Sequence, residues 1–586
     1  MMAPLMEMPT APLRTGTVRS DAVCVEAADG ASQTYGEFFG NVEKWRRWIE
    51  RTVTRDQVLA AQLDLSPISM ALMVASLTVH SRTAWIPPGE AASREQRMIE
   101  QLGDSVYLLD DASAARILDE AESPRLTEIR LDAFGPERWA TTTKFIYFTS
   151  GSEGRPKAVQ VGIGAIANRL QWMWTEFPFA PTDRVVVQKP LSFVASYWEI
   201  LGSVLGGVVA VLISSAERGR PDLFFDVVSS ADATHLFATP VALRGLVEAA
   251  EEHGSALPAL KLVCSSADRF PTSLGRDLAV TAPNARILNL YGATETTANT
   301  SAYELSSTDL SAASVSLGSP IPHTRIVIRD SSGVECDEGV EGSVAVQGLP
   351  LADGYLIRGV LSDGDAFSGT GELREFRSGD LGYMQDGKLF LTGRADNAVN
   401  VSGFKVHLEE IEAAAMQLSG RTGQCAAVYI EDSGASVLAL VVPEDWRGRV
   451  SRTALARSLP PHMVPRLLVP VETLPTVRTG KVDRAECAAL VKEAMRDSRN
   501  SGYSEGGSVE RDTLARLWTS SLGQDSTAVG DDYFHDGGDS LRAVGLLAAV
   551  RRQFGVRVPL RGFYADPSMT FVLSVIRDSD PKGLSR

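Results

Sequence analysis

The chain alternates short apolar runs with stretches of helical periodicity over most of its length. The apolar runs lie at residues 106–109, 145–148, 184–187, 233–237, 261–264 and 286–291. Strands that are buried on both faces appear as continuous apolar runs, and parallel strands need long crossovers, which are usually helices. The pattern therefore predicts an α/β fold with a mainly parallel sheet that is covered on both faces.

Changes in composition and in hydrophobic pattern along the chain predict further domain boundaries. From residue 318 to about 391, short alternating runs separated by Gly and Asp turns indicate a β-rich subdomain that completes a large unit, residues 1–394. A smaller α+β unit is expected at 395–495, and a Gly- and Ser-rich tether at 496–508. The remaining segment, 509–586, has helical periodicity.

The composition excludes several classes of protein. The 586 residues are 44% hydrophobic and 22% charged, which is typical of a soluble globular chain. The net charge of −16 argues against a nucleic-acid partner. There is no long apolar run and no signal peptide, so we expect a cytoplasmic protein without a membrane span. Five scattered cysteines predict neither a disulfide framework nor a zinc site.

A loop rich in glycine and hydroxyl groups follows the apolar run at 145–148. Glycine allows backbone N–H groups to converge on an anion, while hydroxyls and a lysine add donors and positive charge. The sequence FTSGSEGRPK at 148–157 lacks the spacing of a Walker A loop, because proline precedes the lysine and no hydroxyl residue follows it. We predict that it cradles phosphate through Thr149, Ser150, Gly151, Ser152, Gly154 and Lys157.

Further motifs occur in an order that matches a known family. They are QTYGEF at 33–38, AWIPP at 84–88, NLYGATETT at 289–297, FRSGDL at 376–381, GRAD at 393–396, RTGKVDR at 478–484 and DGGDSL at 536–541. With the glycine-rich loop, this series resembles an adenylation domain followed by a peptidyl carrier domain, as in nonribosomal peptide synthetases. The resemblance implies a large adenylate-forming core, a small mobile subdomain and an all-α, four-helix carrier domain.

The resemblance also assigns roles at the nucleotide site. Tyr291 would offer a ring to the purine, Thr294 a hydroxyl to a phosphoryl oxygen, and Glu295 a carboxylate to Mg²⁺. Asp380 would accept hydrogen bonds from the ribose hydroxyls, because an ionised carboxylate is only an acceptor. The other implied ATP/AMP-binding residues are Asn289, Gly292 and Arg394.

Four residues are implied in the two half-reactions. Lys481 would be catalytic, bridging the substrate carboxylate and the α-phosphate. Asp396 would be the hinge of the mobile subdomain, and Gly403 would allow a pantetheine arm to approach the backbone. Ser540, at an expected helix start, resembles the serine that receives 4′-phosphopantetheine.

The implied substrate pocket departs from that of amino-acid-activating members. Where they carry Phe-Asp-x-Ser, this chain has FVAS at 193–196, so the acid that would pair with an α-ammonium is missing. A buried ammonium without a counter-charge is strongly unfavourable. The substrate would then be a β-amino acid, an α-keto or hydroxy acid, or a more unusual nitrogen-bearing acid. The implied pocket residues are Val194, Ala195, Trp198, Val241, Cys264, Ser266, Leu290, Ala298 and Asn299.

The resemblance implies an ATP- and Mg²⁺-dependent ligase that activates a small carboxylic acid and transfers it to the phosphopantetheine thiol of its own carrier domain. We expect a stand-alone loading didomain of natural-product biosynthesis, because no condensation or thioesterase motif is present. Its partners would be a phosphopantetheinyl transferase and downstream biosynthetic enzymes. Two alternatives are an acyl-CoA ligase with a helical appendage and a non-catalytic adenylate-binding scaffold.

Overall fold

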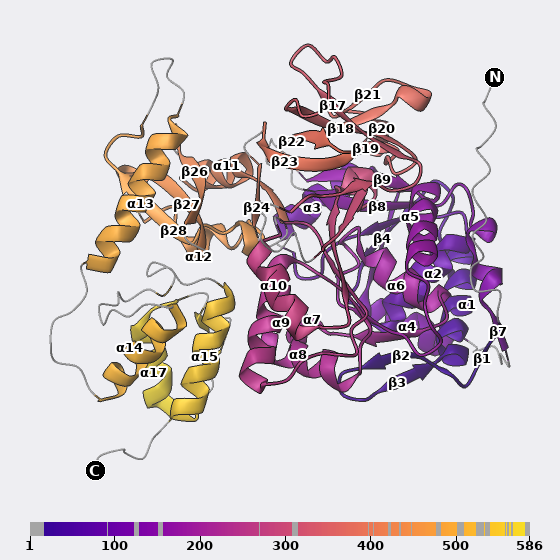
Figure 1. Ribbon diagram of the computed structural model, residues 1–586, viewed down its shortest axis with the longest axis horizontal. Helices are drawn as coiled ribbons and strands as arrows, with labels where there is room; N and C mark the ends of the chain where they lie inside the picture. Colours follow the sequence, from indigo (N-terminus) through magenta and orange to yellow (C-terminus); the bar gives the residue numbers. More distant parts are fainter. Residues whose placement is uncertain are drawn as a thin grey trace. The chain divides into compact units, whose positions relative to one another are not determined.

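The computed structural model describes residues 17–579, apart from 91, 122–127, 150–155, 219, 269, 307–314, 396–397, 402–403, 420–423, 433–434, 447, 476–481, 501–508, 523–532, 534–539, 557, 560–561 and 564–565. Internal contacts divide the chain into two compact units (Figure 1). Unit 1 comprises Met1–Thr149 and Pro156–Asp396, and unit 2 comprises Ser150–Arg155 and Asn397–Arg586. The division falls at residue 396, whereas the boundary predicted from the sequence follows residue 394.

The first sheet of unit 1 has nine strands, in the order β16-β15-β14-β13-β12-β10-β11-β2-β3. The strands between β14 and β2 in this order pair in parallel, as predicted. The edge strands β15, β16 and β3 pair antiparallel with their neighbours. The strands are β2 (Val23–Ala27), β3 (Ser32–Thr34), β10 (Arg184–Val187), β11 (Val209–Leu212), β12 (His235–Ala238), β13 (Leu262–Ser265), β14 (Arg286–Tyr291), β15 (Ser301–Glu304) and β16 (Ser319–Pro320).

Alternate residues of this sheet enter different cores, because successive side chains of a strand point to opposite faces. Val186, Leu236 and Val263 pack into one apolar cluster with the helices α8, α9 and α10, which lie together in Figure 1. Their neighbours Val187, Phe237 and Cys264 pack into a second, larger cluster. The helices on the first face are α8 (Pro221–Ser230), α9 (Pro240–His253) and α10 (Thr272–Thr281), and the short helix α7 (Ser215–Arg218) precedes α8 in the chain.

The second sheet of unit 1 has seven strands, in the order β20-β19-β9-β8-β5-β4-β6. They are β4 (Val58–Gln62), β5 (Arg82–Trp85), β6 (Val106–Asp110), β8 (Lys144–Thr149), β9 (Lys157–Gly162), β19 (Gly354–Ile357) and β20 (Val360–Ser362). One face packs against α3 (Ala92–Leu102) through Met98 and Leu102. The other face contributes Trp85, Phe145 and Tyr147 to the same larger cluster as the first sheet.

Five α-helices contribute to this shared core, and two of them carry residues of the candidate site. They are α1 (Tyr35–Thr52), α2 (Pro67–Thr78), α4 (Asp111–Glu120), α5 (Ile163–Glu176) and α6 (Ser196–Leu205). Helix α1 begins with a capping box, in which Thr34 and Glu37 satisfy each other's backbone N–H groups. Helix α6 follows β10 and α5 follows β9, so the connections after these strands place both helices in the shared core.

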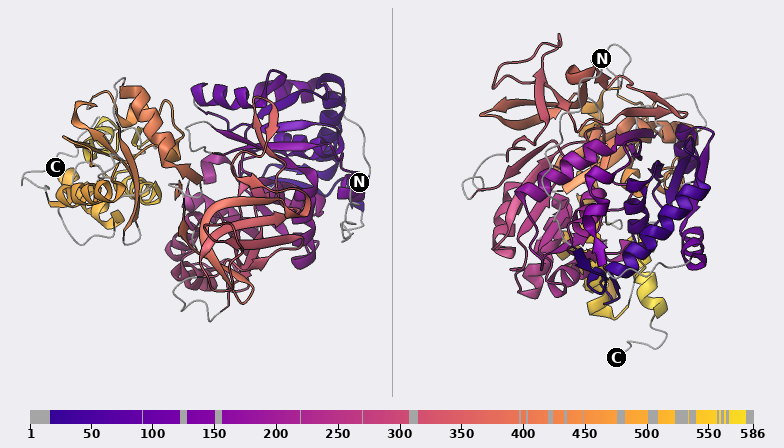
Figure 2. Two further views of the ribbon diagram at one scale, coloured as in Figure 1. Left: turned by 90° about the horizontal axis from the view of Figure 1, so that it is seen from above. Right: turned by 90° about the vertical axis from the view of Figure 1, so that its right-hand side faces the viewer.

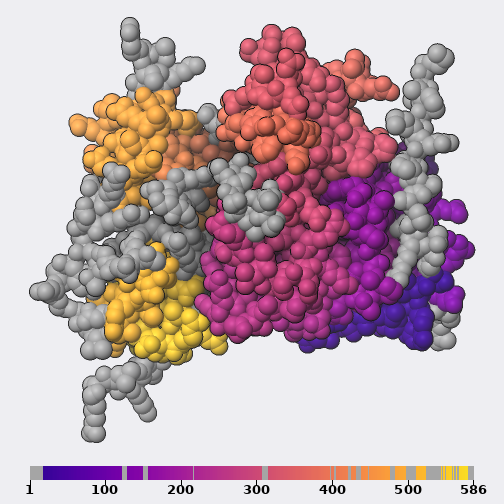
Figure 3. Space-filling model, in the orientation of Figure 1, coloured from indigo at the N-terminus to yellow at the C-terminus, as the bar shows by residue number. Residues whose placement is uncertain are grey.

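A third sheet forms the β-rich part of unit 1, and all its pairings are antiparallel. It forms a layer at one side of the unit (Figure 2), and in the space-filling view its residues, coloured rose to orange, lie at the top of that unit (Figure 3). Its strands are β17 (Thr324–Arg329), β18 (Gly342–Gly348), β21 (Phe367–Ser368), β22 (Glu375–Gln385) and β23 (Lys388–Arg394). Strands β1 (Thr17–Arg19) and β7 (Glu128–Arg130) form a separate two-stranded antiparallel sheet.

Unit 2 begins with an α+β region. A hairpin of β24 and β25 is followed by a three-stranded sheet in the order β26-β27-β28. Val406, Ile411 and Leu440 are among the buried residues of its core. The elements are β24 (Ala398–Val401), β25 (Phe404–His407), α11 (Leu408–Ser419), β26 (Ala426–Asp432), β27 (Ala435–Pro443), α12 (Arg452–Leu455), β28 (Leu467–Val471) and α13 (Arg484–Asn500).

The prediction of a tether beginning at residue 496 is wrong for its first residues. Helix α13 continues to Asn500, through residues 496–500. The segment has no glycine or proline before Gly502, so nothing in it interrupts the helix.

The C-terminal part of unit 2 is helical. Its described helices, which are those of the carrier segment, enclose a small core that includes Trp518, Leu546 and Phe563. They are α14 (Val509–Leu522), α15 (Ser540–Phe554) and α17 (Met569–Ser579). No helix within the described parts of the chain is long and apolar enough to cross a membrane.

Candidate active site

The predicted phosphate loop connects two paired antiparallel strands. Strand β8 ends at Thr149 and β9 begins at Lys157, and these two residues are paired in the register. The loop residues Ser150, Gly151, Ser152 and Gly154 lie outside the described residues. The described flanks include two buried hydroxyls, Tyr147 Oη and Thr149 Oγ1, that have no hydrogen-bond partner among the described residues.

Burial raises the pKa of Tyr147 well above its ordinary value, so its hydroxyl stays protonated. Lys157 Nζ lies 5.3 Å from the centroid of the Tyr355 ring, within reach of a cation–π interaction. The flanks of the loop therefore bring unsatisfied hydroxyl groups and a positive charge to the carboxyl end of β8.

Glu295, the predicted metal ligand, lies in a short 3₁₀ helix, η3 (Thr294–Thr296), after β14. Its side chain is buried, and Oε1 accepts a hydrogen bond of 3.1 Å from Tyr355 Oη. Burial, and then the neighbouring Glu295 carboxylate, raise the pKa of Tyr355, which therefore remains a donor. A hard carboxylate whose orientation is fixed by one oxygen suits Mg²⁺, which is usually bound through one or two carboxylates together with substrate phosphates.

The structure brings three of the predicted nucleotide residues together. Tyr291 Oη donates a hydrogen bond of 2.6 Å to Asp380 Oδ2, and Arg394 forms an ion pair with the other oxygen, Oδ1. Burial raises the pKa of Tyr291 well above its ordinary value, and Asp380 adds to the effect. The backbone N–H of Asp380 is also bound, to Ser378 Oγ at 3.1 Å. These contacts fix the orientation of the Asp380 side chain, and a carboxylate held in this way can accept hydrogen bonds from a vicinal diol.

Gly292 is required by the turn that follows β14. A Cβ placed on Gly292 would lie 2.0 Å from the carbonyl oxygen of Ala298, because the chain folds back onto the strand end. The turn also holds Thr297 and Ala298 at φ values of +54° and +74°, a region that side-chain-bearing residues rarely adopt. Such strain is common where the surrounding structure fixes a functional turn.

Replacing Gly292 by alanine is expected to destabilise unit 1 by about 1–3 kcal/mol, because the added methyl group forces the turn away from β14. Chemical denaturation followed by circular dichroism measures the loss. Gly164→Ala is the matched control, since a Cβ at Gly164 in α5 meets no atom within 4 Å. Equal stability of both variants would show that the turn tolerates the methyl group.

The two remaining predicted nucleotide residues have different surroundings. Asn289 is buried in β14, and its Nδ2 donates to the carbonyl oxygen of Ser316 at 3.1 Å. Thr294 is partly exposed at the start of η3. Thr294 is therefore accessible to a bound phosphate. The hydrogen bond of Asn289 instead connects β14 to the backbone at Ser316.

Most of the predicted pocket residues share the larger core of unit 1. They come from segments at or beyond the carboxyl ends of parallel strands, which is where ligands of open α/β sheets bind. Trp198 stacks on Phe179, with 5.9 Å between ring centroids, and burial raises the pKa of Cys264 to about 12. The buried members of this group are Val194, Trp198, Cys264, Leu290 and Ala298, with Ala195 packed against them.

Three predicted pocket residues lie outside that core. Val241, on the first turn of α9, is 41% exposed, and Ser266, just after β13, is partly exposed. Asn299 is buried, and its Oδ1 accepts hydrogen bonds from Arg169.

Arg169, on α5, is not among the residues predicted from the sequence. Its guanidinium is buried, 4.5 Å from the ring of Trp172 and 5.6 Å from the ring of Trp198. A signal was present in the sequence, since Arg169 is three residues from both Ile166 and Trp172 and so shares the apolar face of the helix. A charged residue in such a position needs a functional or structural reason.

The remaining predicted residues belong to unit 2, except the hinge residue Asp396, which is the last residue of unit 1. Lys481 and Gly403 lie outside the described residues, as does the predicted hinge, Asp396, at the end of unit 1. Ser540 is the first residue of α15, as predicted. A helix N-terminus favours an adjacent anion, so this position fits the phosphodiester of a phosphopantetheine arm.

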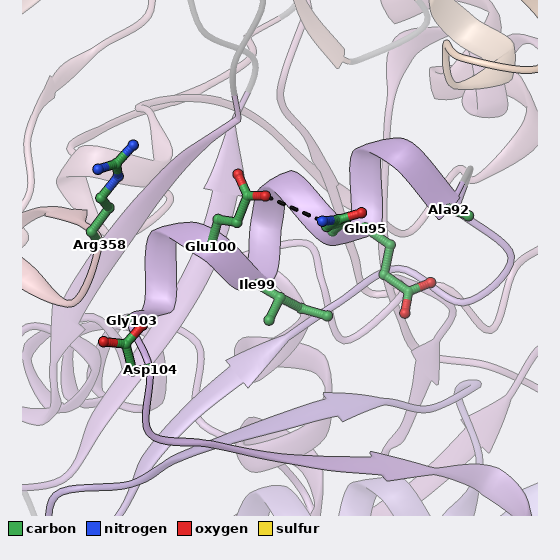
Figure 4. A pocket seen from close by; sticks show the side chains of 8 residues that line it. Ala92, Glu95, Ile99, Glu100, Gly103, Asp104 and Arg358 are labelled. Atoms are coloured by element: carbon green, nitrogen blue, oxygen red, sulfur yellow. Dashed lines mark hydrogen bonds between the residues drawn. The ribbon is translucent and has the colours of Figure 1, made fainter.

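A separate hollow of about 750 Å³ on unit 1 contains none of these residues (Figure 4). It is lined by α3 and the turn at Arg358, with Glu95, Glu100 and Asp104 among its side chains. The acidic lining is not suited to an anionic nucleotide.

Comparisons with known proteins decide the family. A family model described as AMP-binding enzyme matches residues 14–356. The chain belongs to this family of AMP-binding enzymes. A second model, described as phosphopantetheine attachment site, matches residues 512–569, a segment that contains Ser540. The predicted adenylation domain with a carrier domain is therefore confirmed. ATP and phosphopantetheine are the cofactors that these two domains use, and Mg²⁺ is the usual partner of such enzymes.

Relatives of this AMP-binding enzyme are longer proteins, and the chain matches only a part of each. The chain is 34% identical to phenyloxazoline synthase MbtB of Mycobacterium tuberculosis over 423 residues, which cover 70% of the chain and 30% of MbtB. It is 26% identical to bacitracin synthase 3 of Bacillus licheniformis over 539 residues, which cover 89% of the chain and 8% of that synthase. The chain thus spans less than a third of the length of these relatives.

A solved structure supports the fold of this AMP-binding enzyme over nearly its whole length. PA1221, described as an NRPS protein containing adenylation and PCP domains, has a TM-score of 0.74 and 24% identity. The match covers 95% of this chain and 94% of that one. The α/β adenylate-forming fold with a C-terminal helical carrier domain is therefore confirmed.

Proposed function

We propose that the protein activates a small carboxylic acid with ATP and transfers the acyl group to its own carrier domain. The observation that carries this proposal is the Tyr291–Asp380–Arg394 cluster, which orients a carboxylate acceptor for a ribose. The same chain begins α15 with Ser540. A scaffold without catalysis has no need of a carrier serine at a helix N-terminus. An acyl-CoA ligase would not use it either.

In the first step, a carboxylate oxygen of the acid attacks the α-phosphorus of ATP, and pyrophosphate leaves. Lys481 is proposed to offset the charge where one anion approaches another. Glu295 would hold Mg²⁺, which would supply positive charge for the phosphates. Thr149, Lys157 and the loop between them are proposed to hold those phosphates. Positioning and electrostatics supply most of the rate acceleration in such phosphoryl chemistry.

In the second step, a phosphopantetheine arm would supply the thiol to which the acyl group is transferred, with AMP as the leaving group. We propose that Ser540 carries the arm, that Gly403 lines its path, and that a torsional change at Asp396 moves the C-terminal subdomain between the two steps. Ser540 would be modified by a phosphopantetheinyl transferase, and downstream biosynthetic enzymes would accept the product. We further propose that the protein acts in the cytoplasm.

The substrate is proposed to lack an α-ammonium group. Val194, in the position where amino-acid-activating members have an acid, is buried, and it belongs to the same core as Trp198 and Cys264. The pocket residues that are described supply no carboxylate to balance an ammonium. A buried unpaired charge would shift the ammonium to its neutral form or exclude the acid.

Acid-dependent pyrophosphate exchange tests the proposed activity. Purified protein is incubated with ATP, Mg²⁺, labelled pyrophosphate and single acids, including alanine, β-alanine, pyruvate and lactate. We expect exchange with at least one short acid and little exchange with alanine. No exchange with any acid would argue against activation, and a preference for alanine would argue against the assignment of Val194.

A further inference from the structure

We propose that Arg169 is a specificity residue that binds a second oxygen acceptor of the substrate, a carbonyl or carboxylate oxygen separate from the activated carboxyl group. This inference rests on the proposed function and names the substrate class more narrowly. It selects an oxo acid or a dicarboxylic acid, and it excludes an acid whose second group is an ammonium.

The first observation is an unbalanced charge. Three lysine or arginine side chains are buried among the described residues: Arg94, Arg169 and Lys189. Arg94 pairs with Glu90 and Lys189 with Glu199, but Arg169 has no carboxylate within salt-bridge distance in the described part of the chain. Burying an unpaired charge is costly, so a buried arginine without a counter-ion indicates a ligand that supplies one.

The second observation is that buried donors lack acceptors. Arg169 Nη2 donates to Asn299 Oδ1 at 2.9 Å and Nε to the same oxygen at 3.3 Å, while Nη1 has no partner among the described residues. Trp198 Nε1 is also buried without a described partner. Native proteins satisfy almost all such groups, so exceptions need an explanation.

The third observation is the neighbourhood of the guanidinium. Arg169 contacts Asn299 and lies over the ring of Trp198, and both belong to the predicted substrate pocket. Burial lowers the pKa of Arg169 to about 10, so the group remains a cation at neutral pH. The other groups that influence it, Tyr197 and Cys264, are neutral there because burial raises the pKa of each.

The guanidinium and its unpaired Nη1 donor are suited to binding an oxygen acceptor and are not suited to binding an ammonium. A carboxylate neutralises the guanidinium, and a carbonyl oxygen satisfies Nη1 without adding charge. An ammonium would be repelled by the guanidinium and would leave its unpaired donor unsatisfied. A site built to bind a polar group discriminates strongly against analogues that lack it, because its buried groups are then left unpaired.

A panel of four-carbon acids separates these possibilities. Pyrophosphate exchange is measured with butyrate, 2-oxobutyrate, succinate and 2-aminobutyrate, which differ in the second group but not in chain length. We expect kcat/KM for 2-oxobutyrate or succinate to be at least about tenfold above the values for the other two acids. The better of the two shows whether the bound oxygen is a neutral carbonyl or a carboxylate.

Arg169→Gln is expected to remove that preference, lowering kcat/KM for the favoured acid about 100-fold while changing the butyrate value little. Arg325→Gln is the matched control, because Arg325 forms an exposed ion pair with Glu335 in the β-rich sheet. An unchanged preference in Arg169→Gln, or a wild-type preference for 2-aminobutyrate or butyrate, would overturn the assignment. Absence of exchange with every acid would instead argue against the proposed activity.

Asn299→Asp supplies a readout that does not depend on turnover. Its carboxylate would stand where Arg169 Nε and Nη2 already donate, and would balance the guanidinium within the protein. We expect a higher Tm in the absence of substrate, together with weaker activation of the favoured acid. A Tm equal to or below that of the wild type would show that Arg169 has no unbalanced charge, and would overturn the inference.

Discussion

The variant Ser540→Ala is expected to retain acid-dependent pyrophosphate exchange and to lose acyl loading completely. The serine begins α15 in the helical carrier segment, while the Tyr291–Asp380–Arg394 cluster lies in unit 1. Removing the hydroxyl eliminates the attachment point of the arm but leaves the adenylating residues unchanged. Intact-mass spectrometry after incubation with a phosphopantetheinyl transferase, ATP and acid measures the loading.

Ser574→Ala provides a control within the same domain. Ser574 is exposed on α17, where its hydroxyl donates to the backbone carbonyl of Phe571 at 2.7 Å. This variant should gain the arm and the acyl group as the wild type does. If Ser540→Ala still carried an acyl group, the carrier assignment would be wrong.

Replacing Lys481 by alanine is expected to lower adenylation on the order of 100-fold, because a positioned cation at the reacting phosphate stabilises charge that develops in the transition state. The variant should still accept the phosphopantetheine arm on Ser540. Pyrophosphate exchange measures the first effect, and the mass increase of the apo chain measures the second.

The control for this variant is Lys492→Ala. Lys492 is exposed on α13, in the same subdomain, so its loss removes one positive charge without removing a proposed catalytic group. Near wild-type exchange by Lys481→Ala would show that this lysine does not act at the reacting phosphate. Equal losses in both variants would point to a general effect of charge.

Much of the fold could be predicted because local sequence patterns encode it. The runs at Arg184–Val187 and Arg286–Tyr291 are strands with the predicted limits, since apolar residues continue to the turn signals on either side. The start of the tether was misplaced because residues 496–500, which contain no glycine, were grouped with the Gly- and Ser-rich residues that follow them. Residues 496–500 remain helical in α13, where no helix-breaking residue occurs.

The site was predictable where a motif carries its own chemistry. Tyr291, Asp380 and Arg394 were identified from separate motifs, and the structure places them in contact. Contacts between distant segments are not encoded by local patterns. The pairing of Glu295 with Tyr355, and the approach of Arg169 to Asn299, required the sheets and α5 to be assembled around one core.

The mass of the phosphopantetheine-bearing wild-type chain tests the central claim most directly. The protein is incubated with ATP, Mg²⁺ and the acid that gives the strongest pyrophosphate exchange, and its intact mass is recorded with and without ATP. We expect an ATP-dependent increase equal to the mass of the acid minus water, absent from the chain that lacks the arm. An arm-bearing chain that gains no mass from any acid, despite active pyrophosphate exchange, would contradict transfer to its own carrier domain.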